Sequence, residues 1–252
     1  MSRTILITGA TGKFGKAFVQ HFLNAGDCVI AAGRSTEALA HLADAHTEAN
    51  GRLLTIEADL LQERAIGKVA DSLEYLGVKP DCLVNNARNA SFLRVAESGL
   101  VKRENFLAEF TLDVVIPYEL VMTVANMQGS ALRAVVNIGS QYGTVAPNLA
   151  LYDDPERQSP IHYGVAKAAL AHLTKELAVR LANRGVRVNC VAFGGVEGRV
   201  DASFRERYAA LCPMGRMLRD DEVVGPVDML LSDTASSITG HTVVADGGWS
   251  IW

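Results

Sequence analysis

The sequence predicts an α/β fold in which helices cover both faces of a doubly wound, parallel, seven-stranded sheet. Three observations support this fold class. Seven short runs of apolar and β-branched residues recur along the 252 residues, and segments with a helical period lie between most of them. A glycine-rich turn directly follows the first apolar run and leads into a helical pattern. Such alternation favours a three-layer αβα sandwich with right-handed crossovers.

The predicted strands are apolar on both faces, as expected for a parallel sheet that is covered on both sides. They are expected at Thr4–Thr8, Cys28–Ala32, Leu53–Glu57, Cys82–Asn85, Ala134–Ile138, Arg187–Ala192 and Thr242–Ala245. A typical helical pattern between them has apolar residues at Phe14, Phe18, Phe22 and Leu23 and ends before Gly26. No linker or internal repeat divides the chain, so residues 1–252 are expected to form a single domain.

Composition and charge narrow the class of partner. Hydrophobic residues make up 49% of the chain and charged residues 21%, which is typical of a globular protein. The formal net charge of −4 argues against nucleic acid and anionic membranes, so a small-molecule substrate is expected. The apolar run at Thr4–Thr8 breaks at Gly9 and is too short to span a membrane. The four widely spaced cysteines predict no disulfide, no metal site and a cytoplasmic location.

The glycine-rich turn reads Thr8-Gly9-Ala10-Thr11-Gly12-Lys13-Phe14-Gly15, with glycines three residues apart. Where a strand ends and a helix begins, bare backbone can approach a pyrophosphate, and the free N–H groups and the helix dipole favour its charge. The turn therefore predicts a Rossmann-type dinucleotide site. A tight turn that only allows close packing of helix on strand gives the same pattern.

The second predicted strand is followed by Arg34 and Ser35, with no acidic residue. An acidic residue here usually binds the ribose hydroxyls of NAD, whereas an arginine accommodates the 2′-phosphate of NADP. Lys13 is expected to add a second positive charge, and Ser35 a hydrogen bond. NADP(H) is therefore predicted in preference to NAD(H), the alternative being that these basic residues are solvated surface charges.

Tyr163 and Lys167 are four residues apart on a helical pattern, so they project from the same face of the helix. A nearby ammonium stabilises a phenolate, which suits a tyrosine to acid–base catalysis. A random Tyr and Lys on one helix have the same spacing. The strand that leads to Ser140 adds a hydroxyl at the sheet edge where doubly wound folds bind their ligands.

Seven ordered motifs resemble the single-domain branch of the short-chain dehydrogenase/reductase family over nearly the whole chain. They are Thr8–Gly15, Asp59-Leu60, Asn85-Asn86-Ala87, Ser140, Tyr163 with Lys167, Arg187-Val188-Asn189 and Asp246-Gly247-Gly248. The resemblance implies an oxidoreductase that interconverts a carbonyl and a secondary alcohol. It also implies a homo-oligomer, a dimer or a tetramer, in which the helices near Phe106–Met127 and Tyr163–Asn183 pair across subunits.

The resemblance implies a role for each matching residue. Tyr163 would be the general acid/base, Ser140 would hydrogen-bond the substrate oxygen, and Lys167 would support Tyr163 and hold the nicotinamide ribose. Contacts with the cofactor are implied for Gly9, Thr11, Gly12, Lys13, Phe14, Gly15, Arg34, Ser35, Asp59, Leu60, Asn86, Ala87, Tyr163, Lys167 and Val196.

Two positions near the expected site depart from the family pattern. Asp113 stands where the family has its fourth catalytic residue, an Asn. It can contact Lys167, but its charge would favour the ammonium and weaken the effect of that cation on Tyr163; a purely structural role is the alternative. Arg88 replaces the glycine of the family's Asn-Asn-Ala-Gly motif and is expected to face either the substrate or solvent.

Two segments, at about 147–160 and 198–212, are expected to form substrate loops. Ser140 and Tyr163 are 23 residues apart, so roughly ten residues are inserted at the mouth of the site relative to the family. The polar residues of this insert would suit a hydroxylated ligand; they are Asn148, Tyr152, Asp153, Asp154, Glu156 and Arg157. A similar insert occurs in a family branch associated with flagellin modification and nonulosonic-acid sugar synthesis. A sugar-derived substrate is therefore one hypothesis, and a solvated loop without a ligand is the other.

Two further functions stay open. A nucleotide-sugar epimerase or dehydratase that uses bound NAD would share the fold, but the chain leaves no room for the second domain of that branch. A catalytically silent nucleotide-sensing protein would account for Asp113 and Arg88, but not for the retention of Ser140, Tyr163 and Lys167.

Overall fold

The computed structural model describes residues 2–198 and 200–252 and contains the predicted seven-stranded sheet. All of its strands pair in parallel, in the order β3-β2-β1-β4-β5-β6-β7. The strands are β1 (Thr4–Thr8), β2 (Cys28–Gly33), β3 (Leu53–Glu57), β4 (Cys82–Asn85), β5 (Ala134–Ser140), β6 (Arg187–Phe193) and β7 (Thr242–Ala245). The order turns back between β1 and β4, which confirms the doubly wound topology and sets the place where ligands bind such sheets.

Three strands continue one or two residues beyond their predicted ends. Gly33 continues β2 because it pairs with Glu57 of β3. Ser140 continues β5 and Phe193 continues β6 because these two residues pair with each other. The added residues bring β5 and β6 to the edge at which the candidate site lies, so Ser140 is held by sheet hydrogen bonds.

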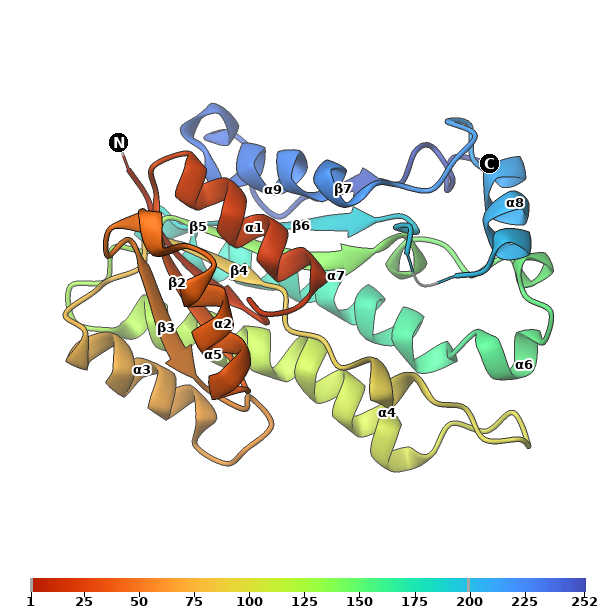
Figure 1. The fold of residues 1–252 in the computed structure, drawn as a ribbon, viewed down its shortest axis with the longest axis horizontal. Coiled ribbons are helices and arrows are strands. Elements are labelled where there is room, and N and C mark those ends of the chain that lie inside the picture. Colours follow the sequence, from red (N-terminus) through yellow and green to blue (C-terminus); the bar gives the residue numbers. More distant parts are fainter. Residues whose placement is uncertain (1, 199) are drawn as a thin grey trace.

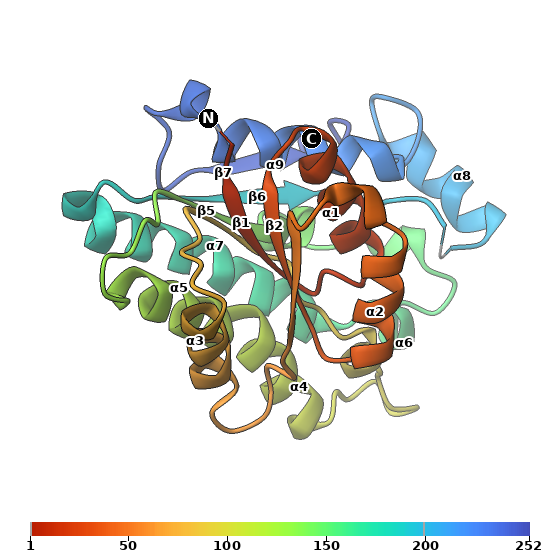
Figure 2. The ribbon, with the colours of Figure 1, turned by 60° about the vertical axis from the view of Figure 1, so that its left-hand side comes forward.

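The helices form two layers, one on each face of the sheet (Figure 1). One layer consists of α1 (Lys13–Asn24), α2 (Thr36–Asp44) and α9 (Val224–Leu231). The other consists of α3 (Ala65–Tyr75), α4 (Arg103–Phe110), α5 (Ile116–Asn126) and α7 (Ile161–Leu181). The turned view in Figure 2 shows α3, α5 and α7 together on one side of the strands. The three-layer αβα sandwich is confirmed.

Each layer buries an apolar face of its helices against the sheet. Phe18 and Phe22 of α1 are fully buried with the side chains of β1 and β2 on one face, and Leu73 of α3 and Leu120 of α5 are fully buried on the other. Burial of such a side chain stabilises the fold by about 1.5–3 kcal/mol. Because both faces are covered, the central strands are mostly apolar, as the sequence pattern requires.

A chain of buried hydrogen bonds ties α7 to the middle of the sheet. The amide of Asn85 donates to the side-chain oxygen of Asn137 at 2.8 Å, and the amide of Asn137 donates to the hydroxyl of Thr174 at 2.9 Å. The Thr174 hydroxyl in turn donates to the carbonyl of Leu170. Since unpaired polar groups are costly in a core, this chain fixes the position of α7 relative to β4 and β5. Helix α7 is the element that carries Tyr163 and Lys167.

Two short helices lie beyond the carboxyl ends of the strands. They are α6 (Pro155–Gln158), in the insert, and α8 (Ala202–Leu211), and Figure 1 shows both at the same end of the molecule. Among the helices described, none is long and apolar enough to cross a membrane.

Candidate functional site

A cavity of about 620 Å³ opens at the carboxyl ends of the strands. Most residues predicted for the site line it; these are Gly9, Thr11, Gly12, Lys13, Phe14, Arg34, Asp59, Leu60, Asn86, Ala87, Ser140, Tyr163, Lys167 and Val196. Three predicted residues, Gly15, Ser35 and Asp113, are not part of the lining. Residues from six strand ends and from α7 therefore meet at one place, although they are far apart in the sequence.

The glycine-rich turn between β1 and α1 is tightly packed. Gly9 has a φ of +63°, and a Cβ there would lie 2.7 Å from the Cα of Ala87. A Cβ on Gly15 would lie 2.2 Å from the carbonyl oxygen of Gly9, so Gly15 allows α1 to approach the turn rather than lining the cavity. The amide of Asn86 donates to the carbonyls of Thr8 and Gly9 at 3.0 and 3.1 Å, which holds the turn against β4.

The first turn of α1 faces the cavity without a capping side chain. Gly12 occupies the N-cap position, its backbone is extended, and the first turn contains no acidic residue. The backbone N–H groups at this end have no partner within the helix, and the helix dipole favours an anion there. A phosphate group fits such a place better than a neutral ligand does.

The three residues predicted to recognise a 2′-phosphate are differently placed. Arg34 is exposed and lines the cavity. The Ser35 hydroxyl caps α2 by accepting a hydrogen bond from the Ala38 amide at 3.2 Å. Lys13 forms an ion pair with Asp220 at 2.7 Å and donates to the carbonyl of Glu197. Among the described residues, the charge of Lys13 is thus paired, whereas Arg34 takes part in no ion pair.

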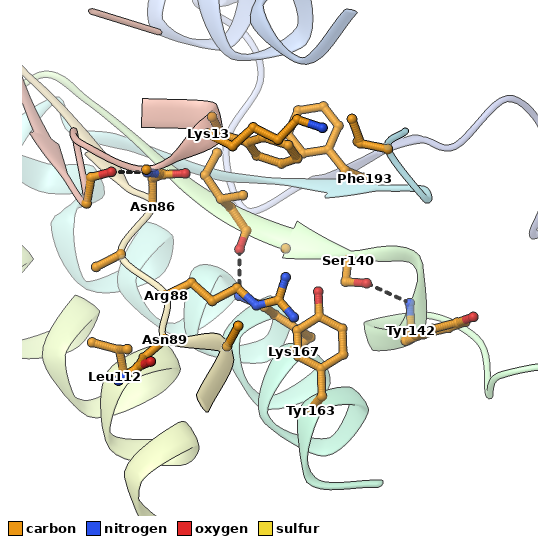
Figure 3. A pocket seen from close by; sticks show the side chains of 18 of the residues that line it. Lys13, Asn86, Arg88, Asn89, Leu112, Ser140, Tyr142, Tyr163, Lys167 and Phe193 are labelled. Atoms are coloured by element: carbon orange, nitrogen blue, oxygen red, sulfur yellow. Dashed lines mark hydrogen bonds between the residues drawn. The ribbon is translucent and has the colours of Figure 1, made fainter. Parts of the chain in front are cut away.

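Tyr163 and Ser140 face the same part of the cavity. Figure 3 shows the Tyr163 hydroxyl pointing into the space between Ser140 and Arg88. The Ser140 hydroxyl accepts a hydrogen bond from the backbone amide of Tyr142 at 3.2 Å, so its own proton remains available to a further acceptor. Two hydroxyl donors thus converge on one region at the edge of the sheet.

Lys167 lies beneath Tyr163 and is almost completely buried. Its ammonium is 5.8 Å from the centroid of the Tyr163 ring, 3.0 Å from Oδ1 of Asp113 and 3.0 Å from the carbonyl oxygen of Ile138. Burial lowers the pKa of Lys167, but the nearby Asp113 and Tyr163 raise it by more than burial lowers it. The pKa of Lys167 is therefore above its ordinary value. The lysine therefore remains an ammonium at neutral pH.

Asp113 lies on a π-helical turn, η3 (Thr111–Val115), between α4 and α5. Its side chain is buried, Oδ1 accepts from Lys167, and Oδ2 has no hydrogen-bond partner among the described residues. The π turn interrupts a longer helical run, as such turns often do at functional sites. The contact between Asp113 and Lys167 considered from the sequence is thus present.

Glu109 is a buried carboxyl group that the sequence patterns did not identify. It is 1% exposed, and neither of its side-chain oxygens has a partner within the part of the chain that the structure describes. Burial, and then the nearby charge of Asp113, raise the pKa of Glu109 to about 7, although Lys167 and Arg88 act in the opposite direction. Its position four residues before Asp113 on a helical run is the signal from which it was predictable.

Arg88 lies over the ring of Tyr163. The Cζ atom of its guanidinium is 4.7 Å from the centroid of the ring, within the range of a cation–π contact. Arg88 also lines the cavity, as Figure 3 shows. Of the two orientations considered from the sequence, the side chain takes the one toward the site.

The insert is packed against α8 rather than being a solvated loop. Leu151 is fully buried in a small cluster with Tyr208, Cys212, Met217 and Trp249. The guanidinium of Arg207 donates to the carbonyl of Leu151 at 2.8 Å and forms an ion pair with Asp153 at 3.1 Å. The two segments predicted as substrate loops are therefore fastened to each other.

Three of the six polar residues of the insert have their partners within the insert itself. Asn148 accepts from the Ala150 amide, and Asp154 pairs with Arg157. Of the polar set proposed to suit a hydroxylated ligand, Tyr152 is the member that lines the cavity, where its hydroxyl is 3.0 Å from that of Tyr142. This wall is more aromatic than the sequence pattern indicated, because Phe204 and Tyr208 of α8 complete it.

The family model described as enoyl-(acyl carrier protein) reductase matches residues 9–250. This span covers the glycine-rich turn, Ser140, Tyr163 and Lys167. The chain belongs to the short-chain dehydrogenase/reductase family. As a short-chain dehydrogenase/reductase, it is an oxidoreductase that acts on CH–OH groups with a nicotinamide cofactor.

Individual relatives agree with this assignment. The chain is 33% identical to an uncharacterised short-chain type dehydrogenase/reductase of Sinorhizobium fredii, over 98% of this chain but 43% of that longer protein. It is 26% identical to post-translational flagellin modification protein A of Campylobacter coli, over 99% of both chains. A short-chain dehydrogenase of Leptospira borgpetersenii, solved with bound NAD+, has a TM-score of 0.86 at 27% identity and covers 99% of this chain and 93% of its own.

The raised pKa of Glu109 predicts that this carboxyl destabilises the folded short-chain dehydrogenase/reductase as the pH rises. The unfolded chain binds the proton with a pKa near 4.5 and the folded chain with a pKa of about 7, so the stability present below pH 4.5 is lost as the pH approaches 7. The free energy of unfolding of the unchanged protein should therefore fall between about pH 5 and about pH 8. Glu109→Gln, which mimics the neutral form, should avoid this loss, so its free energy of unfolding should rise by about 2 kcal/mol relative to the unchanged protein over the same range. Urea unfolding at both pH values measures this difference.

Glu104→Gln is the matched control, because Glu104 lies on the same helix but is exposed. It should leave the pH dependence of stability unchanged. Parallel curves for Glu109→Gln and the unchanged protein would contradict the prediction.

Proposed function

We propose that this short-chain dehydrogenase/reductase is an NADP(H)-dependent enzyme that interconverts a carbonyl and a secondary alcohol, with Tyr163 as the general acid/base. The observation that carries the proposal is the convergence of Tyr163 and Ser140 on one part of the cavity, with the Lys167 ammonium 5.8 Å from the Tyr163 ring. The groups that a carbonyl oxygen needs as proton and hydrogen-bond donors are thus present together.

The residues of the cavity fit a nicotinamide dinucleotide. The uncapped start of α1 and the bare backbone at Gly9 and Gly12 suit the pyrophosphate, and Asp59 and Leu60 after β3 suit the adenine end. Asn86, Ala87 and Val196 would complete the contacts along the cavity. When bound, the cofactor supplies or accepts a hydride, which is chemistry that no side chain provides.

In the direction of reduction, Tyr163 would give its phenolic proton to the substrate oxygen as the substrate carbon gains a hydride. The carbonyl π bond breaks, and a C–H and an O–H bond form. Ser140 would donate a hydrogen bond to the same oxygen while negative charge develops on it. Tyr163 is left as a phenolate, which the Lys167 ammonium stabilises until a proton returns.

Asp113 would act through Lys167 rather than on the substrate. Its carboxylate accepts from the Lys167 ammonium at 3.0 Å, in a place that is almost free of solvent. It therefore keeps the lysine charged and fixes the direction of its N–H groups. The same negative charge offsets part of the attraction between Lys167 and a phenolate. Asp113 therefore holds Lys167 in position but weakens the stabilisation that Lys167 gives to the phenolate.

Replacement of Tyr163 by phenylalanine tests the catalytic proposal. Tyr163→Phe should lower kcat by about 10²–10⁴-fold because the proton donor is lost, while NADPH binding changes little. Turnover is measured on a panel of keto-sugars and simple ketones through the absorbance of the reduced nicotinamide. Tyr75→Phe, which removes an exposed hydroxyl on α3 outside the cavity lining, is the control and should retain activity. Unchanged turnover of Tyr163→Phe would exclude the mechanism.

The preference for NADP(H) is proposed from Arg34. Arg34 lines the cavity after β2, where the 2′-phosphate of NADP lies in dinucleotide folds, and the sequence there has no acidic residue to bind a ribose diol. Arg34→Ala should weaken NADPH binding by about 10–100-fold and leave NADH binding nearly unchanged, since a charge-assisted hydrogen bond contributes about 1.5–3 kcal/mol. Fluorescence titrations of both dinucleotides measure this. Lys68→Ala, on the outer surface of α3, is the control; tighter binding of NADH than of NADPH by the unchanged protein would reverse the assignment.

A sugar-derived substrate is proposed from the whole-length similarity to flagellin modification protein A and from the cavity wall. Tyr142, Tyr152 and Asn89 offer hydroxyl and amide groups to a hydroxylated ligand, and aromatic rings pack well against sugar faces. In this proposal residues 1–252 act as one nucleotide-binding domain, and specificity comes from the segments 147–160 and 198–212. A cytoplasmic location stays a prediction from the cysteine pattern.

A homo-oligomer is proposed from exposed apolar side chains on α4, α5, α7 and the π turn between α4 and α5. They are Leu107, Val115, Tyr118, Ile161, Val165 and Val179, each at least 36% exposed. Light scattering should give a mass of two or four times 27.0 kDa. Val165→Glu should lower this mass, whereas Tyr75→Glu, an exposed site on α3, should not. A particle of 27.0 kDa for the unchanged protein would contradict the proposal.

A further inference from the structure

Arg88 stands at the centre of the candidate site with its charge uncommitted. It follows β4 directly, lines the cavity, and holds its guanidinium 4.7 Å from the centroid of the Tyr163 ring. Within residues 2–198 and 200–252, its side chain takes part in no ion pair or hydrogen bond. An arginine that stacks on an aromatic ring keeps its N–H groups free for a ligand at the edge of the guanidinium.

The two lysines of the cavity lining already have partners. Lys167 is paired with Asp113 at 3.0 Å, and Lys13 with Asp220 at 2.7 Å. Both charges are therefore compensated by a carboxylate within the described residues. Arg34 is the remaining arginine of the lining, and it lies after β2, at the end of the cavity assigned to the adenosine part of the cofactor.

The wall around Tyr163 does not supply a negative charge to meet Arg88. Near Tyr163 the lining consists of hydroxyl, amide and aromatic side chains: Ser140, Gln141, Tyr142, Tyr152, Phe204 and Tyr208. Asp59, the carboxylate in the lining, follows β3 at the adenine end. Glu109, which is close enough to influence Arg88, is buried behind the wall and has a pKa of about 7, so it is partly neutral.

We propose that Arg88 binds an anionic group of the substrate, a carboxylate or a phosphate, beside the carbonyl that reacts at Tyr163. The guanidinium presents paired N–H groups that match the oxygens of either anion. In a partly enclosed aromatic cavity such a contact is stronger than in water. The proposal rests on the proposed function, because it assigns the substrate class of the same site.

The position of Arg88 also orients the substrate. An anion held at the guanidinium lies next to the Tyr163 ring, so a carbonyl a few bonds away falls between Tyr163 and Ser140. Arg88 would thus determine both the affinity for the substrate and the orientation of the substrate carbonyl. Keto acids and keto phosphates, with their hydroxy counterparts, are the substrates that this arrangement fits.

Equilibrium binding to the protein saturated with NADP+ tests the proposal without requiring turnover. Titration calorimetry compares two pairs of probes, each with a charged and a neutral member: acetoacetate with methyl acetoacetate, and dihydroxyacetone phosphate with dihydroxyacetone. The unchanged protein should bind the charged member of at least one pair more tightly, and the pair that shows the difference distinguishes a carboxylate site from a phosphate site.

Arg88→Met, which keeps the length of the side chain and removes its charge, should weaken binding of the charged probe by about 10–100-fold and of its neutral partner by less than about 3-fold. Arg88→Lys should restore part of the loss, because it keeps the charge without the paired N–H groups. Arg94→Met is the matched control, since Arg94 is an exposed arginine on the same connection and does not line the cavity.

Three outcomes would overturn the proposal: no preference of the unchanged protein for a charged probe, an equal loss for both members of a pair, or a loss confined to NADP+ affinity. The last outcome would assign Arg88 to the cofactor. Failure of Tyr163→Phe to lose activity would refute the mechanism but leave this binding result unaffected, so the two proposals fail separately.

Discussion

The buried ion pair between Lys167 and Asp113 is the interaction on which the candidate site depends. It joins α7 to the π turn before α5 at a distance of 3.0 Å, in a region with almost no solvent. Two charges in such a place are tolerated because each satisfies the other, and the Ile138 carbonyl accepts a further hydrogen bond. Removal of one partner would leave an unpaired charge in the core, at a cost of about 3–5 kcal/mol. The pair therefore constrains the positions of both helices, and with them the position of Tyr163.

The pair also links catalysis to the electrostatics of the core behind it. Glu109 lies at the end of α4, two residues before the π turn, and its neutral form avoids a second negative charge beside Asp113. Arg88 adds a second positive charge near Tyr163, with its Cζ atom 4.7 Å from the ring centroid. Two cations thus lie near the tyrosine: Lys167, which is paired with a carboxylate, and Arg88, which lines the cavity.

Much of this architecture was predictable from local patterns. The apolar runs gave all seven strands, because a parallel sheet covered on both faces demands continuous apolar residues. The four-residue spacing of Tyr163 and Lys167 placed them on one helix face. The pairing of Lys13 with Asp220, the burial of Leu151 against α8 and the orientation of Arg88 were not predictable in this way, since they are contacts between residues distant in the sequence. Ser35 shows a further limit of prediction from the sequence. A hydroxyl at the start of a helix often caps the helix, and the Ser35 hydroxyl accepts a hydrogen bond from the Ala38 amide in this way.

The packing of the insert against α8 bears on how substrate specificity can change in this family member. Arg207 joins the two segments through the Leu151 carbonyl and the Asp153 carboxylate, and the buried side chain of Leu151 closes the space between them. Each segment is therefore supported by the other. If the insert alone were transferred into a relative, Leu151 would be exposed and the contacts with Arg207 would be lost. Transfer of both segments would keep these contacts, and with them the cavity wall that the segments form. The insert and α8 thus form one module for loop grafting, although the 41 residues 161–201 separate them along the chain.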